Sequence, residues 1–80
     1  MGVPGRSSPA GKKNYFGPRL KTLRKARKSR AVDVIARLGT LGWDVTAQTY
    51  SEIESGKRML ADTELMLILR VLGASLRDLE

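Results

Sequence analysis

The chain contains neither cysteine nor histidine in its 80 residues. Without cysteine it has no disulfide framework and no thiolate metal site, and without histidine it has no imidazole for zinc binding or acid–base catalysis. Its carboxylates form no recognisable catalytic pair, and no glycine-rich segment leads into Lys-Ser or Lys-Thr as a phosphate loop does. We therefore expect no enzyme activity, no catalytic residues, no cofactor, no metal and no small-molecule ligand.

Long apolar runs are also missing. The longest, residues 65–69, has five residues, whereas a membrane span needs roughly 20. The N-terminus lacks the apolar core of a secretion signal. We expect a soluble cytoplasmic protein with no membrane partner.

Charge is present but unevenly distributed. Residues 1–30 hold ten of the 15 basic residues and no acidic residue, whereas residues 31–80 hold five basic and eight acidic residues, so the two parts carry +10 and −3. Such asymmetry favours a polyanionic partner, most simply nucleic acid, contacted through the first half. The alternative is a basic segment that only aids solubility.

The composition divides the chain in two. Residues 1–14 are rich in Gly, Pro, Ser and Lys and poor in bulky apolar residues, so we expect a flexible basic arm that stays disordered or reaches along a nucleic acid. Residues 15–80 are expected to form one compact all-α domain, a five-helix bundle, because apolar residues recur at helical spacing. The expected helices cover residues 17–28, 31–38, 47–55, 62–72 and 75–80.

The most informative segment runs from Val45 to Arg58. Thr46 is a suitable N-cap, Val45 and Tyr50 can form a hydrophobic staple across it, and Gly56 is a suitable left-handed stop. Basic residues follow immediately. A short helix with small polar residues on its exposed first half, followed by a basic loop, is typical of a DNA recognition helix.

This segment, V-T-A-Q-T-Y-S-E-I-E-S-G-K-R, resembles the phage repressor and Cro-like helix-turn-helix domains of the xenobiotic-response-element type. The resemblance covers residues 17–79, and the long turn with Gly42-Trp43-Asp44 resembles a bacterial subgroup. It implies a lambda-repressor-like fold and a transcriptional regulator that binds double-stranded DNA, as a homodimer, in the nucleoid of a bacterium or phage host. A protein-interaction adaptor, or an antitoxin or restriction-controller component, is the alternative use of the same bundle.

The resemblance also assigns the DNA-contacting positions. The base-contacting residues would be Ala47, Gln48 and Glu52. Gln48 is the strongest candidate, because a glutamine amide can pair bidentately with adenine, while Ala47 suits a thymine methyl. Glu52 either accepts from cytosine N4 or stays solvated and repels non-cognate sites. The phosphate contacts would come from Thr46, Thr49, Lys57, Arg58, Arg30 and Lys28, with Lys21 and Lys25 also plausible.

One position departs from the family pattern. Family members commonly have a phosphate-binding glutamine at the start of the second helix, where this chain has Ala31, so a shifted or weaker backbone contact is expected unless Arg30 substitutes.

The remaining assignments are structural. The resemblance implies an ion pair between Arg24 and Glu54. The alternative is that Glu54 is an exposed surface acid. Trp43 is expected to anchor the turn rather than touch DNA, and Tyr50 to lie in the core. Met59 and Met66 are expected to be packing residues, and Leu67 and Val71 to form a second apolar strip that contacts a fifth helix or another subunit.

Overall fold

A computed structural model describes residues 15–79, and within them all regular secondary structure is helical. It forms four α-helices and one short 3₁₀ turn: α1 (Gly17–Ala26), α2 (Ala31–Thr40), α3 (Ala47–Ser55), α4 (Asp62–Leu72) and η1 (Leu76–Leu79). The all-α prediction is confirmed, but the prediction of five helices is wrong, because residues 76–79 make only one 3₁₀ turn. The expected flexible arm, residues 1–14, lies outside the described residues.

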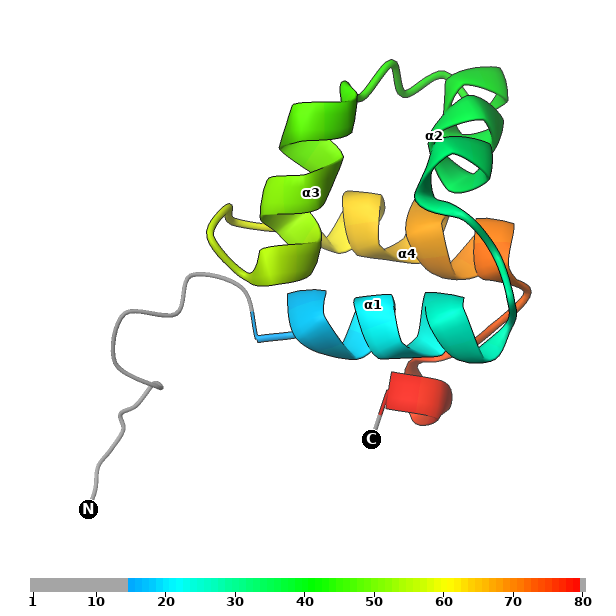
Figure 1. The fold of residues 1–80 in the computed structure, drawn as a ribbon, viewed down its shortest axis with the longest axis vertical. Helices are drawn as coiled ribbons and strands as arrows, with labels where there is room; N and C mark the ends of the chain where they lie inside the picture. The colour runs from blue at the N-terminus through cyan, green and yellow to red at the C-terminus, as the bar shows by residue number, and fades with distance from the viewer. Residues whose placement is uncertain (1–14, 80) are drawn as a thin grey trace.

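The helices surround a single apolar core. α1 contacts α3 and η1, and α2 contacts both α3 and α4, an arrangement that Figure 1 shows with α1 lying below α3 and α2. Apolar residues three and four positions apart give each helix one inward face. The buried core consists of Leu20, Val34, Leu38, Val45, Tyr50, Ile53, Leu65, Ile68, Leu69, Leu72 and Leu79.

α3 and α4 begin and end where the sequence predicts. The Thr46 hydroxyl accepts a hydrogen bond from the Thr49 N–H at 3.1 Å, which caps the first turn of α3. Gly56 follows α3 with φ 84° and Gly73 follows α4 with φ 66°, a left-handed backbone that glycine adopts without strain. At the start of α4, the side chain of Ala61 has no acceptor and cannot cap the helix. The Glu64 carboxylate caps it instead, by accepting a hydrogen bond from the Ala61 N–H at 3.1 Å.

The boundaries of α1 and α2 differ from the prediction. α1 ends at Ala26, two residues early, because Lys28 takes a left-handed conformation with φ 58° and the Ser29 N–H bonds back to the Arg24 carbonyl at 3.1 Å. α2 continues through Gly39 to Thr40. Gly42, with φ 96°, is the glycine that makes the turn.

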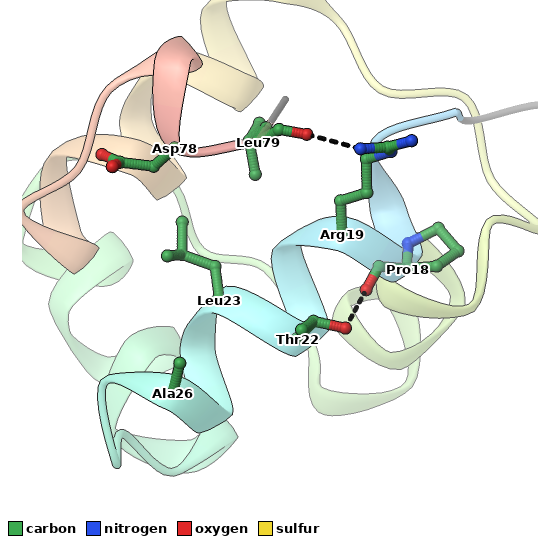
Figure 2. A pocket seen from close by; sticks show the side chains of 7 residues that line it. All are labelled: Pro18, Arg19, Thr22, Leu23, Ala26, Asp78 and Leu79. Atoms are coloured by element: carbon green, nitrogen blue, oxygen red, sulfur yellow. Dashed lines mark hydrogen bonds between the residues drawn. The ribbon is translucent and has the colours of Figure 1, made fainter.

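Two arginines, Arg19 of α1 and Arg27 directly after α1, hold the C-terminal segment in place. Arg19 donates to the Leu79 carbonyl at 2.8 Å, and Arg27 donates to the carbonyls of Leu72 and Gly73 at 3.0 and 2.9 Å. Figure 2 shows the Arg19 contact above a hollow of about 470 Å³ between α1 and η1. These basic residues therefore have structural partners.

Several apolar predictions are corrected. Met59 and Met66 are 70% and 56% exposed, so neither is a packing residue. Leu67 and Val71 pack against the core cluster instead of forming a free strip. Trp43, at the α2–α3 turn, is half-buried against the same cluster, as expected.

None of the helices found in residues 15–79 is long and apolar enough to cross a membrane.

Candidate nucleic-acid interface

α3 presents a polar surface on one side and a core surface on the other. Ala47, Gln48 and Ser51 are exposed, whereas Tyr50 and Ile53 are each 1% exposed. The apolar spacing of three residues orients the helix, and the side chains between them face outward. Gln48 is thus free to approach a base edge, because no hydrogen bond in the described residues uses its amide.

An ion pair fixes α3 to α1. Arg24 Nε lies 2.7 Å from Glu54 Oε2, and Arg24 Nη2 lies 3.1 Å from Oε1, which makes the pair bidentate. The two side chains are only 11% and 6% exposed, so Glu54 is not a surface acid. A third bond, from Arg24 to the Ser29 carbonyl at 2.8 Å, ties the pair to the connection before α2. The hydrogen bond to Glu54 raises the pKa of Arg24, which therefore stays charged.

Tyr50 lies beside this ion pair. Its hydroxyl is buried and lacks a hydrogen-bond partner within the described residues. Burial, and secondly the negative charge of Glu54, raise the pKa of the Tyr50 hydroxyl. Tyr50 is a core residue, as predicted, and its hydroxyl is buried beside Glu54 without a hydrogen bond of full geometry.

A hollow of about 460 Å³ joins the three helices at this surface. Lys21 of α1, Ala31 and Val32 of α2, and Ala47 and Ser51 of α3 contribute to its lining. α2 begins here, and its N-cap residue makes no side-chain capping bond. Helix N-termini favour anions, and Lys21 adds a positive charge where the side chain of Ala31 cannot hydrogen-bond.

The predicted phosphate-contacting residues do not all lie together. Lys28 lines a different hollow with residues of α2 and α4, and none of α3 contributes to it. Arg30 is 77% exposed and pairs with Asp33 at 3.2 Å. Nothing in the sequence distinguishes Lys21 from the other surface lysines, but Lys21 lines the same hollow as Ala47. Its proximity to α3 depends on how α1 packs against α3, which the composition does not reveal.

The loop after α3 supplies the remaining basic residues. Lys57 and Arg58 are exposed, and the N–H groups of both donate to the Glu52 carbonyl, at 2.9 and 3.3 Å. Arg58 also pairs with the Glu52 carboxylate, with Nε and Oε1 3.4 Å apart. The exposed half of α3 and this basic loop are therefore joined at Glu52.

Among residues 15–79, no cluster of acidic side chains could hold a metal ion. The site is instead a polar helix surface flanked by cations, which has the chemistry to bind a polyanion and to form hydrogen bonds with base edges.

These features define the class of a helix-turn-helix DNA-binding domain. A helix-turn-helix family model matches residues 20–79, and the chain belongs to this family of DNA-binding regulators, of the xenobiotic-response-element and lambda-repressor-like type. No curated protein and no solved structure matches the chain significantly. Assignment to the subgroup with the long Gly-Trp-Asp turn stays a prediction.

Proposed function

We propose that this protein binds double-stranded DNA in a sequence-specific manner and acts as a transcriptional regulator. The observation that carries the proposal is the exposed first half of α3, which lies between a buried anchor on one side and a basic loop on the other. A helix so placed can enter the major groove with its N-terminal residues against base edges. Family membership supports the same partner.

Base reading would depend mainly on Gln48. Its exposed amide can donate to N7-side acceptors and accept from the N6 amine of adenine in a bidentate pair. Ala47, one residue before it, would contact a thymine methyl. Glu52, half-exposed at the other end of this surface, would accept from cytosine N4 where that base is present.

Backbone contacts would come from both sides of α3. Lys57 and Arg58 lie after the helix, and Thr46 and Thr49 lie at its N-terminus, where the helix dipole favours phosphate. Lys21, which lines the same hollow as Ala31, would supply the phosphate contact that the usual glutamine makes, and Arg30 and Lys28 would add to it. About five phosphate contacts would give a salt dependence of about −4 to −5 in the logarithmic slope.

A homodimer on a two-fold operator would suit this class of protein, with half-sites about one helical turn, roughly 34 Å, apart. A regulator of this kind acts by occluding or recruiting polymerase, in the compartment that holds the DNA.

The alternative is a protein-interaction adaptor that uses the same bundle. Two exposed methionines, Met59 and Met66, favour it, because exposed methionine suits adaptable protein contacts. The half-burial of Leu67 and Val71 weighs against it, because the strip proposed as a partner surface already packs on the core.

Selection from a random duplex DNA pool at near-physiological salt tests the proposal, with Gln48→Ala in parallel. We expect an enriched motif whose adenine position relaxes in the variant. Met66→Ala is the matched control, because it alters an exposed residue of α4 and should leave the motif unchanged.

The two functions give different outcomes. A two-fold motif would indicate a dimer and a single half-site a monomer. Absence of any enriched motif, with Gln48→Ala indistinguishable from wild type, would reject sequence-specific binding and favour the adaptor.

A further inference from the structure

The two cations after α3 differ in their surroundings. The Arg58 guanidinium is 3.4 Å from the Glu52 carboxylate, and the side chains are 52% and 35% exposed. Lys57 is also exposed, and its ammonium forms no ion pair with any residue between 15 and 79. One of two adjacent cations is thus paired with an acid on α3, while the other is free to bind phosphate.

The main chain holds this loop independently of the ion pair. The N–H groups of Lys57 and Arg58 both donate to the Glu52 carbonyl oxygen, and Gly56 provides the left-handed turn that brings them there. Glutamine at position 52 would keep these backbone bonds and nearly the same side-chain shape. Removal of the carboxylate charge can therefore be separated from disruption of the loop.

We propose that Glu52 limits non-specific DNA binding by neutralising Arg58. This inference rests on the proposed function, because it requires α3 to face duplex DNA. A protein gains non-specific affinity by releasing the counterions of each phosphate that it neutralises. A guanidinium with a carboxylate at 3.4 Å brings little net charge to a phosphate, so on non-cognate DNA Lys57 contributes and Arg58 does not.

This arrangement bears on specificity. Discrimination depends on the difference between affinities for the correct and the competing sites. An acid that suppresses one phosphate contact lowers the affinity for every competing site without any new base contact. On a site that offers cytosine N4 to Glu52, the carboxylate gains another partner and Arg58 becomes available to the backbone.

The experiment measures binding to a short duplex of scrambled sequence over about 50–200 mM salt, where each phosphate contact adds about 0.9 to the logarithmic slope. The variants are Lys57→Gln, Arg58→Gln, Glu52→Gln and the double variant Glu52→Gln/Arg58→Gln. We expect Lys57→Gln to reduce the slope by about 0.9. Arg58→Gln should reduce it by less on this scrambled duplex, because Arg58 contacts phosphate only where Glu52 has another partner.

Glu52→Gln should steepen the slope by about 0.9, so that affinity falls about three- to fourfold more across this salt range. The double variant should return the slope to the wild-type value, because the added contact belongs to Arg58. In the free protein, Glu52→Gln should also shift the Arg58 Nε–H resonance, a readout that needs no DNA.

Two results would overturn the inference while leaving DNA binding intact. One is an equal effect of Glu52→Gln with and without Arg58, which would mean that Glu52 acts only by general repulsion. The other is an equal loss of slope in Lys57→Gln and Arg58→Gln. A wild-type protein that fails to bind any duplex would instead reject the proposed function, and this inference with it.

Discussion

Glu54 joins α3 to α1 through a buried ion pair. It is a buried acid, and its two oxygens are bonded to Arg24 of α1. The sequence could indicate this pair only through family resemblance, because Arg24 and Glu54 are 30 residues apart and no sequence pattern predicts that they touch. Its burial separates it from the exposed ion pairs of this chain, which stabilise a fold by at most about 1 kcal/mol.

Replacement of Glu54 by alanine should lower the free energy of unfolding by about 3–5 kcal/mol, because it leaves the Arg24 guanidinium largely buried without its counter-charge. Urea denaturation followed by circular dichroism measures this. Glu52→Ala is the control, since Glu52 is on the same helix but half-exposed, and its effect should stay within about 0.5 kcal/mol. Equal stability of Glu54→Ala and wild type would show that the pair does not hold α3.

Removal of the Tyr50 hydroxyl, unlike removal of the Glu54 carboxylate, is not expected to lower stability. Its hydroxyl is buried without a hydrogen-bond partner within residues 15–79, and such a group costs about 1–3 kcal/mol of desolvation. Tyr50→Phe should therefore leave thermal stability unchanged or raise it. Calorimetry of both proteins at neutral pH is the measurement, and a clear loss of stability in the variant would show that the hydroxyl bonds to Glu54 in solution.

The same substitution should alter the response to alkali. The pKa of Tyr50 in the folded protein lies above its unfolded value of 10.0, so above that pH the folded state binds more protons than the unfolded state. Stability must then fall as pH rises beyond about 10. The difference in unfolding free energy between wild type and Tyr50→Phe should grow in favour of the variant between about pH 10 and 11, whereas a constant difference would contradict the burial of the hydroxyl.

At the scale of whole elements, helices with strong local signals were predictable and those without were not. α3 and α4 have glycine stops at Gly56 and Gly73, and both were placed to the residue. α1 ends at a left-handed Lys28, a conformation that no sequence signal marks in a lysine. α2 passes through Gly39 because tertiary packing of Leu38 and the turn outweigh the helix-breaking tendency of glycine.

The site was partly predictable for the same reason. Gln48, Lys57 and Arg58 follow from the local form of α3 and its stop, so their exposure could be foreseen. The proximity of Lys21 to Ala47 and the pairing of Glu52 with Arg58 depend on how helices and loops lie against one another, and periodicity does not specify either.

Thr46 tests how far α3 depends on its local cap. Its hydroxyl accepts from the Thr49 N–H at 3.1 Å, and loss of an N-cap costs about 0.5–2 kcal/mol. Thr46→Ala should lower stability by that amount, while Thr46→Ser, which keeps the hydroxyl, should remain within about 0.3 kcal/mol of wild type. Chemical denaturation decides between them. If alanine and serine behave alike, the helix is held by Tyr50 and Glu54 rather than by its cap.

At the scale of the molecule, the first helix and the last turn close the structure together. Arg19 of α1 and Arg27, the residue after α1, donate to carbonyls in residues 72–79, and Leu79 is 3% exposed. α1 also carries the Arg24–Glu54 pair that holds α3. The chain of contacts from η1 through α1 to α3 should therefore couple the C-terminal segment to the recognition helix.

Leu79→Ala tests this coupling. Truncation of a buried leucine costs about 2–5 kcal/mol, and if the domain unfolds as one unit the loss must appear everywhere, including at the opposite end of the molecule. Trp43 belongs to the turn between α2 and α3, and Figure 1 shows that turn on the opposite side of the molecule from η1. The fluorescence of Trp43 and the far-ultraviolet circular dichroism should therefore shift to the same lower urea midpoint. Leu76→Ala is the matched control, because Leu76 is 46% exposed in the same turn and its truncation should cost less than about 1 kcal/mol. A Trp43 transition that stays at the wild-type midpoint in Leu79→Ala would mean that η1 frays independently and that α1 and α3 hold the recognition surface without it.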